Sequence, residues 1–234
     1  MHIFENKKIF ISVPKTGTTS ALFLIRKKWK EKHFCKHASL YSFPLSKEEK
    51  NYKKITLIRD PRTWYKSRII FDLRIFKNNK KNHASIFTET FKINNEFSKE
   101  NIKILLSRFF NLTETFKEEK LLEDFKRNLK KAREYDKFCW LKYQFPEQID
   151  DITPEFFENK SLYFWYLSKL GALDNEVKKY KLETEFSKML KEEFDIHEKI
   201  KINISFNPKE DILQEIFNSV EKNEEYLLER LGYK

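Results

Sequence analysis

The chain has 234 residues, a length that suits one sizeable α/β domain and is short for two. Its 47 Lys and Arg residues outweigh 36 Asp and Glu residues, and the charge of +11 favours anionic ligands: a phosphorylated nucleotide, an acidic glycan, nucleic acid or a membrane surface. Lysines on solvated helix faces account for the same excess. Two cysteines indicate neither a disulfide framework nor a metal centre. The sequence shows no basic-then-apolar leader and no run of membrane-spanning length, so we expect a cytoplasmic protein without a transmembrane segment.

Residues 9–13, IFISV, form a short apolar and β-branched run that predicts a buried strand. Pro14 ends this run, and a hydroxyl-rich turn leads into an apolar stretch over residues 21–25 that predicts a helix. Such a strand–turn–helix unit directs backbone N–H groups and the positive end of a helix dipole at one point, which suits a phosphate or sulfate group. Lys15 adds a positive charge there, although an ordinary turn with a solvated lysine gives the same pattern. The turn is not a Walker A motif, because Lys15 precedes its only glycine, Gly17.

Residues 54–58, KITLI, predict a second buried strand, and Arg59 follows it. Asp60 is well placed to cap a helix that begins at Pro61. An arginine at the carboxyl end of a strand offers a bidentate fork to a phosphate, and Ser67 adds a hydroxyl on the helix that follows. The alternative is that Arg59 pairs with Asp60 or with another carboxylate.

These two units resemble the two signatures of the sulfotransferases that use 3′-phosphoadenosine 5′-phosphosulfate (PAPS). Residues 14–19, PKTGTT, match the Pro-Lys-x-Gly-Thr-Thr pattern of the 5′-phosphosulfate loop, and Arg59 and Ser67 stand at the spacing of the 3′-phosphate signature. The resemblance implies a P-loop-type α/β fold, with a central parallel sheet flanked by helices and a largely helical middle and C-terminal part, and no metal. It implies a 5′-phosphosulfate site made by Lys15, Thr16, Gly17, Thr18 and Thr19, and a 3′-phosphate site made by Arg59 and Ser67. It is strong over residues 9–75 and faint elsewhere, and it indicates a bacterial or Golgi-like branch of the family.

His37 is the candidate general base. Residues 36–40, KHASL, resemble the version seen in carbohydrate-type and bacterial members, in which a histidine upstream of the second strand takes the proton of the acceptor hydroxyl. An unperturbed histidine has a pKa near 6.5, so it is largely neutral at pH 7 and able to accept a proton. His33 is the rival for this role, and the alternative to both is a His37 that makes only local hydrogen bonds.

The middle of the chain predicts exposed and helical structure. Polar residues over 77–101 predict an exposed excursion, and apolar residues at helical intervals over 102–143 predict amphipathic helices. The resemblance implies a single sulfotransferase-like domain over residues 1–234, in which residues 77–165 form a helical insertion or lid that recognises the acceptor.

Three further segments carry weaker signals. Trp140 and Gln144 loosely resemble a Trp-x-x-Gln element of the carbohydrate sulfotransferases. The aromatic residues 163–166 predict either a surface on which a sugar stacks or packed core. Residues 177–194 predict a helix.

The predicted function is transfer of a sulfuryl group from PAPS to an acceptor hydroxyl, most favourably on a carbohydrate. His37 would deprotonate the acceptor, and Lys15 would neutralise the charge that grows on the bridging oxygen. No metal is required, because a sulfuryl group carries less charge than a terminal phosphoryl group. The alternatives are a P-loop kinase with a degenerate loop, against which the missing Gly-Lys-Thr triplet counts, and a basic nucleic-acid-binding or scaffold protein. A sulfotransferase needs no nucleic-acid partner, and the sequence does not indicate an oligomeric state.

Overall fold

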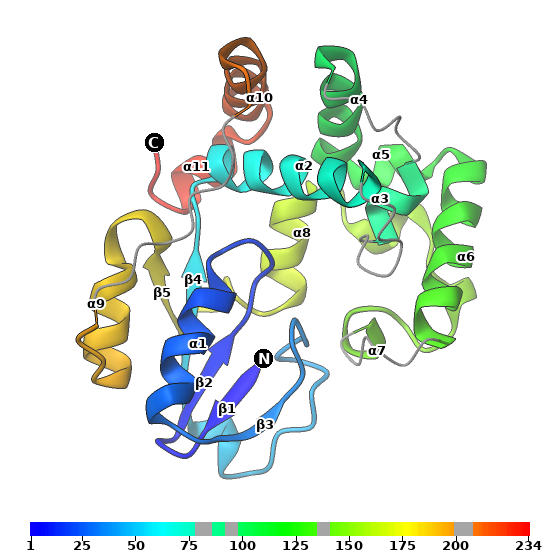
Figure 1. Ribbon diagram of the computed structural model, residues 1–234. Helices are drawn as coiled ribbons and strands as arrows, with labels where there is room; N and C mark the ends of the chain where they lie inside the picture. Colours follow the sequence, from blue (N-terminus) through cyan, green and yellow to red (C-terminus); the bar gives the residue numbers. More distant parts are fainter. Residues whose placement is uncertain (78–85, 92–97, 135–140, 199–207) are drawn as a thin grey trace. The chain divides into compact units, whose positions relative to one another are not determined.

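The computed structural model describes residues 1–77, 86–91, 98–134, 141–198 and 208–234, and the chain divides into two compact units (Figure 1). The sheet unit comprises Met1–Asp60, Cys139–Gln144 and Tyr166–Ile204. The helical unit comprises Pro61–Phe138, Phe145–Trp165 and Ser205–Lys234. Each unit is therefore assembled from three separate stretches of chain. The single domain with its insertion at 77–165 stays a prediction.

The sheet unit is built on a mixed sheet whose described strands number five, in the order β3-β1-β2-β4-β5. The strands are β1 (His2–Phe4), β2 (Lys8–Ile11), β3 (Glu31–Phe34), β4 (Lys53–Ile58) and β5 (Val177–Lys181). β2, β4 and β5 are parallel neighbours, whereas β1 is antiparallel to both β2 and β3. The predicted α/β class is confirmed. The predicted parallel sheet holds for β2, β4 and β5 alone among the described strands, and the sheet is mixed because β1 runs against its neighbours. β2, β4 and β5 all end at one side of the sheet, which we call the carboxyl edge.

Helices cover one face of this sheet. The sheet unit contains α1 (Thr18–Lys28), α7 (Leu141–Gln144), α9 (Leu182–Phe194), a short 3₁₀ helix at Glu49–Asn51 and the end of α8 (Leu162–Lys169). The apolar stripes of α1 and α9 pack on the sheet in one core cluster, whose members include Phe4, Phe10, Leu22, Ile25, Ile55, Leu57, Tyr180, Phe186 and Phe194 (Figure 1). Each large apolar side chain buried in this way contributes roughly 1.5–3 kcal/mol, so this cluster fixes α1 and α9 against the strands.

The prediction of a helix over residues 177–194 is wrong in its first part. Val177–Lys181 form the strand β5, and α9 begins at Leu182. Val177 and Tyr180 are buried, whereas the lysines between them lie at the surface or half-buried, so the segment carries too few apolar residues to show a clear strand pattern. Parallel pairing with β4 decides its conformation, which is a tertiary effect that overrides local preference.

The helical unit consists of helices around an aromatic core. Its helices are α2 (Pro61–Lys77), α3 (Ile86–Phe91), α4 (Lys99–Phe110), α5 (Leu112–Phe116), α6 (Glu119–Glu134), α10 (Glu210–Asn223) and α11 (Glu225–Arg230), together with the start of α8 and two 3₁₀ helices at Ile149–Asp151 and Pro154–Phe157. The fully buried side chains of its core include Trp64, Tyr65, Phe87, Phe109, Phe116, Phe125, Phe157, Tyr163 and Trp165.

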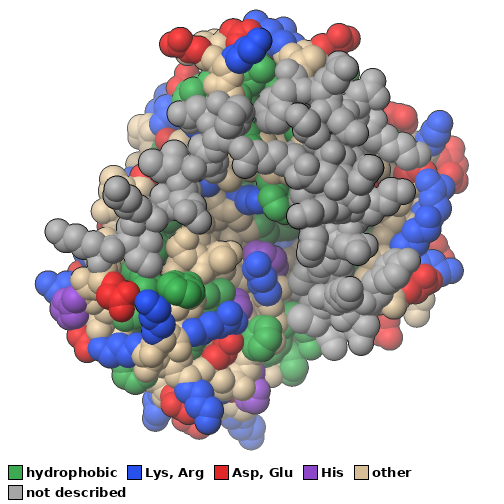
Figure 2. Space-filling view, in the orientation of Figure 1, with side chains coloured by type: hydrophobic (Ala, Val, Ile, Leu, Met, Phe, Trp, Pro, Cys, Tyr) green, Lys and Arg blue, Asp and Glu red, His purple; other side chains and the backbone are tan. Residues whose placement is uncertain are grey.

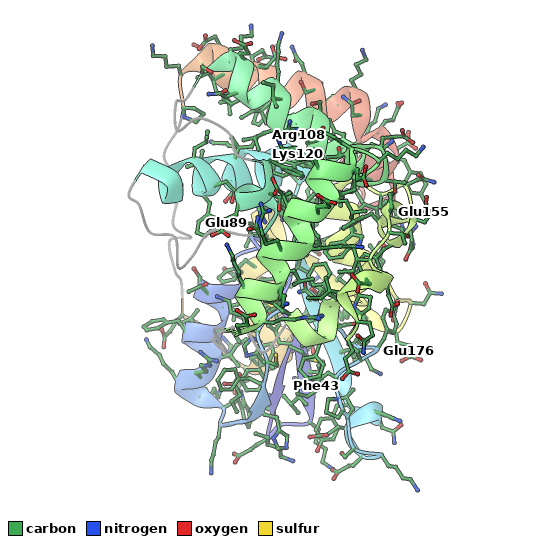
Figure 3. All side chains as sticks on the ribbon, turned by 90° about the vertical axis from the view of Figure 1, so that its right-hand side faces the viewer. Phe43, Glu89, Arg108, Lys120, Glu155 and Glu176 are labelled. Atoms are coloured by element: carbon green, nitrogen blue, oxygen red, sulfur yellow. The ribbon has the colours of Figure 1, made fainter. Side chains whose placement is uncertain are left out.

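The predicted amphipathic helices are confirmed as α4, α5 and α6; α6 buries its apolar stripe and exposes charged residues such as Lys120 (Figure 3). The exposed excursion predicted over 77–101 is wrong at α3, because Phe87 and Phe91 are buried in the aromatic core. Of the aromatic residues 163–166, Tyr163, Trp165 and Tyr166 belong to packed core, whereas Phe164 is half-buried; the Tyr163 ring stacks on Trp64 with centroids 4.4 Å apart. Among the described helices, none combines the length and the apolar character needed to cross a membrane.

Candidate functional site

The turn between β2 and α1 has a backbone shape that is fixed by its own hydroxyl groups. Thr16 Oγ1 and Thr18 Oγ1 both donate to the Val13 carbonyl, at 2.9 and 3.0 Å, and both side chains are buried. Lys15 and Gly17 have φ angles of 64° and 74°, in the left-handed region. Because the hydroxyl protons of Thr16 and Thr18 are bonded to the Val13 carbonyl, these two residues stabilise the shape of the turn. The backbone N–H groups of the turn are the donors that suit an anion.

The N-terminus of α1 opens onto this turn without a capping side chain. Gly17 occupies the N-cap position, no side chain of the described residues accepts a hydrogen bond there, and the first turn of α1 contains no acidic residue. Thr19 is exposed on that first turn. The φ angle of Gly17 favours glycine, and a Cβ atom there would lie 2.5 Å from Leu182 Cδ1, so a side chain at this position would also displace the end of Leu182. The positive end of the helix dipole is therefore directed at the turn that carries Lys15.

Arg59 connects the end of β4 to this turn. Its Nη1 donates to the Lys15 carbonyl at 3.0 Å, and its Nε lies 3.8 Å from Glu183 Oε1 on α9. Glu183 Oε1 also accepts from the Asp60 backbone N–H at 3.2 Å. In these contacts, Glu183 supplies the carboxylate near the Arg59 guanidinium. Asp60 takes part through its backbone N–H, which donates to Glu183. The structure thus brings Lys15 and Arg59, from two neighbouring parallel strands, to one point of the carboxyl edge.

His37 lies at the same edge, where it is bonded to the residue that follows β2. The Ser12 carbonyl accepts from His37 Nδ1 at 2.6 Å, and Ser12 Oγ accepts from the His37 backbone N–H at 2.9 Å. A carbonyl oxygen only accepts, so Nδ1 carries the ring proton and Nε2 carries the lone pair. Burial lowers the His37 pKa from 6.5 to about 3, and the charge of Lys36 adds to this effect. His37 is therefore neutral across the physiological range, with a lower pKa than the sequence-based expectation assumed.

His33 has different surroundings. Its exposed side chain on β3 places Nε2 3.7 Å from Glu49 Oε1, beside a pocket of about 850 Å³. This pocket is lined by Lys32, His33, Phe34, Cys35, Phe43, Pro44, Leu45, Ser46, Glu49 and Tyr143, of which Phe43 is labelled in Figure 3. His37, in contrast to His33, is hydrogen-bonded to the strand end that leads into the Lys15 turn.

Two predicted elements remain predictions. Ser67 lies half-buried on α2 in the helical unit, and its pairing with Arg59 at a 3′-phosphate stays a prediction. Trp140 lies outside the described residues. Gln144, its partner in the Trp-x-x-Gln resemblance, is buried on α7, and its Nε2 donates to the His37 carbonyl at 2.5 Å.

Sequence reasoning missed three contributors to the carboxyl edge: Ser12, Glu183 and the contact of Gln144. Ser12 is fully buried, and a hydroxyl residue inside an apolar strand run was a signal that a polar partner had to exist. Glu183 stands in the first turn of a helix, which the sequence explains as an ordinary dipole effect. No local signal predicts the contact between Gln144 and His37.

The basic tail of α1 is paired with acidic residues. Arg26 lies 2.9 Å from Glu31, Lys27 lies 3.4 Å from Glu198, and Lys28 lies 2.5 Å from Asp195. On the face shown in Figure 2, blue and red side chains are interspersed around this part of the sheet unit. The tail is therefore a mixed-charge surface, which is unlike the continuous basic stripe typical of nucleic-acid binding.

None of the protein-family models, curated proteins or solved structures with which we compared the chain gives a significant match. The carboxyl edge combines a glycine turn at the N-terminus of α1, Lys15 and Arg59 beside that turn, and His37 bonded to the end of the strand that enters it.

Proposed function

We propose that the protein is a PAPS-dependent sulfotransferase of P-loop type. The observation that carries the proposal is the β2–α1 turn: its sequence is PKTGTT, it opens onto the N-terminus of α1 without a carboxylate, and the Arg59 guanidinium is bonded to the Lys15 carbonyl within it. A turn of this kind suits a phosphate or phosphosulfate group, because its backbone N–H groups and a helix dipole are directed at one point, and two cationic residues, Lys15 and Arg59, lie at the turn.

The nucleotide would be recognised at both of its phosphorylated ends. Lys15 and the backbone N–H groups of the turn would hold the 5′-phosphosulfate, with Thr16 and Thr18 fixing the turn and Gly17 and Thr19 providing amides. Arg59 and Ser67 would hold the 3′-phosphate, as the sulfotransferase signature implies. This 3′-phosphate site distinguishes PAPS from ADP or ATP, and it is the part of the proposal that a kinase does not share.

The proposed transfer step uses His37 as the base and Lys15 as the cation. The acceptor hydroxyl oxygen attacks the sulfur in line, the bond between sulfur and the bridging phosphate oxygen breaks, and adenosine 3′,5′-bisphosphate leaves. His37 Nε2 takes the hydroxyl proton, because Nδ1 already carries the proton donated to Ser12. Lys15 neutralises the negative charge that develops on the bridging oxygen. A bound dianion near His37 raises the pKa of the imidazole above its unliganded value, which strengthens the base when the donor is present.

We propose a carbohydrate hydroxyl as the acceptor and a step that uses no metal ion. The carbohydrate assignment rests on the resemblance of residues 36–40 to carbohydrate-type members. The acceptor lid assigned to residues 77–165 belongs to the same proposal.

The test is calorimetric titration with adenosine 3′,5′-bisphosphate and with ADP, each with and without Mg²⁺. Micromolar binding of the bisphosphate without metal, with little binding of ADP, supports the proposal. Binding of ADP only with Mg²⁺ contradicts it in favour of a P-loop kinase. Binding of neither nucleotide contradicts it as well, and then steeply salt-dependent binding of DNA or RNA would indicate a basic nucleic-acid-binding protein.

A matched pair of variants locates the binding site. Lys7 and Lys15 have similar φ angles, 60° and 64°, but Lys7 precedes β2 and Lys15 follows it. Lys15→Ala should weaken or abolish bisphosphate binding, and Lys7→Ala should leave it unchanged. Equal losses in both variants would show that general positive charge, and not the PKTGTT turn, attracts the nucleotide.

A further inference from the structure

His37 occupies a position in a turn that favours glycine. The Cys35 carbonyl accepts from the Ala38 N–H at 3.1 Å, so residues 35–38 form a β-turn in which His37 is the third residue. Its φ angle of 62° lies in the left-handed region, where a side chain costs on the order of 1–2 kcal/mol. A histidine keeps such a conformation only where surrounding contacts hold it.

Among the contacts of the described residues, three hydrogen bonds hold His37, each on a different group. Ser12 Oγ accepts from its N–H at 2.9 Å, and the Ser12 carbonyl accepts from Nδ1 at 2.6 Å. The His37 carbonyl accepts from Gln144 Nε2 at 2.5 Å. The Ser12 contacts fix the backbone on the N-terminal side of His37 and the ring, whereas the Gln144 contact fixes the peptide plane that follows. Gln144 reaches His37 from a segment 107 residues away.

The burial of Gln144 is hard to explain by stability alone. Its side chain is 5% exposed, and its Oε1 is buried with no hydrogen-bond partner among the described residues. A buried polar atom without a partner costs about 1–3 kcal/mol. The short helix α7 that carries Gln144 is tied to the segment after His37, because Ser42 Oγ donates to the Tyr143 carbonyl at 2.6 Å. The contact of Ser42 therefore helps to hold the Gln144 side-chain amide beside His37. Among the described residues, the hydrogen bond of this amide is the one to the His37 carbonyl.

We propose that Gln144 is a positioning residue for His37, which keeps the imidazole in the tautomer that can accept a proton. This inference rests on the proposed function, in which His37 is the base. Without the Gln144 contact the peptide after His37 rotates, and the ring moves away from the Ser12 carbonyl. Nδ1 then loses its acceptor, and the proton moves to Nε2 in part of the population. A ring with its proton on Nε2 cannot take the proton of an acceptor hydroxyl at that nitrogen.

The first test measures the ring nitrogens of His37 by ¹⁵N NMR. In the unmodified protein at neutral pH, we expect protonated Nδ1 and unprotonated Nε2. Gln144→Met keeps the length of the side chain and removes the N–H donor, so the share of the Nδ1-protonated ring should fall. Tyr41→Phe is the matched control, because it removes a hydrogen bond from the segment after His37 to Asp174 without touching α7 or His37, and it should leave the His37 signals unchanged. Identical His37 signals in Gln144→Met and the unmodified protein would overturn the inference.

A second variant covers the case in which Gln144→Met does not fold. Gln144→Glu keeps the shape of the side chain, but its ionised carboxylate cannot donate to the His37 carbonyl, while its protonated form can. The Nδ1-protonated pattern should therefore be lost at high pH and regained as the pH falls through the pKa of the new carboxyl group. His37 signals that do not change over that titration would overturn the inference.

Kinetics separate this inference from the proposed function. Gln144→Met should lower kcat about tenfold, the equivalent of one lost hydrogen bond, and leave the KM for PAPS and the affinity for adenosine 3′,5′-bisphosphate unchanged. Unchanged kcat with normal bisphosphate binding would overturn the positioning role and leave the proposed function standing. If the bisphosphate binds neither protein, the proposed function fails, and the NMR comparison still decides whether Gln144 positions His37.

Discussion

Two helices, α1 and α9, begin at the carboxyl edge of the sheet, and their first turns differ in acidic residues. α1 begins after the turn over residues 12–17 with a glycine at its N-cap and no acidic residue in its first turn. α9 begins directly after β5 and carries Glu183 and Glu185 in its first turn. Glu185 Oε2 accepts from the Lys181 N–H at 2.9 Å, and Glu183 Oε1 accepts from the Asp60 N–H at 3.2 Å.

Both helices present the same positive dipole end, so the difference lies in what neutralises it. The chain neutralises α9 with its own carboxylates, and one of them also lies 3.8 Å from the Arg59 guanidinium. α1 has no carboxylate of its own at that end, and a lysine stands beside it. An anion from outside the chain therefore suits the N-terminus of α1 better than that of α9.

The largest expected effect is on turnover in Lys15→Ala. Removing the cation that meets the developing charge should lower kcat by about 10²–10³-fold, as for the loss of one preorganised donor to a transition-state oxyanion. Sulfuryl transfer is measured with ³⁵S-labelled PAPS, with Lys7→Ala as the control. Near-normal turnover in Lys15→Ala would refute the assignment of Lys15.

The second effect is a pH dependence of stability that originates at His37. Burial lowers the folded-state pKa of His37 to about 3, whereas the unfolded chain has an ordinary value of 6.5. As the pH falls below 6.5 the unfolded state takes up a proton and the folded state does not, so stability falls by on the order of 3 kcal/mol as the pH approaches 3. Above pH 6.5 both states are neutral at this group, and no change arises from it.

His37→Asn checks this origin, because asparagine tolerates the positive φ angle and does not titrate. Urea unfolding at a series of pH values should give a flatter curve for His37→Asn than for the unmodified protein between pH 6.5 and 4. Parallel curves would show that His37 is not the titrating group.

The third prediction concerns a carboxylate placed in the first turn of α1, where α9 has one. Thr19 and Glu183 are both the second residue of their helices, so Thr19→Glu gives α1 the carboxylate that it lacks. Bisphosphate affinity should fall about 10–100-fold through charge repulsion, while the unfolding free energy should rise by about 0.3–1 kcal/mol through the dipole. Thr19→Gln is the uncharged control. Unchanged affinity in Thr19→Glu would place the anion elsewhere.

The smallest expected effect follows from removing a carboxylate from the first turn of α9. Glu183→Gln preserves an acceptor for the Asp60 N–H but removes the negative charge near Arg59, so bisphosphate affinity should rise about 2–5-fold at low salt. Glu185→Gln, in the same turn, should leave the affinity unchanged, because Glu185 bonds the Lys181 N–H instead. Isothermal titration at two salt concentrations measures both; a decrease in affinity for Glu183→Gln would show that Glu183 orients Arg59 rather than neutralising it.

Local chemistry determined the part of the site that the sequence predicted. The apolar run over residues 9–13 predicted β2, and Pro61 marked the start of α2. The PKTGTT turn could be placed between a strand and a helix because glycine, proline and hydroxyl residues act within a few positions of themselves. These signals were sufficient to bring Lys15 and Arg59 to the ends of two strands.

Tertiary structure decided the rest, since the deciding contacts join residues far apart in the chain. Val177–Lys181 become a strand only by pairing with β4, and Phe87 is buried only because other aromatic rings surround it. The contacts of Ser12 and Gln144 with His37 span 25 and 107 residues. Hydrogen bonds of this kind leave no periodic or turn signal in the sequence, because the partner of each polar group is chosen by the packing of the whole unit. The sequence therefore determined which groups carry charge at the carboxyl edge, and the fold decided the tautomer, the neutrality and the orientation of His37.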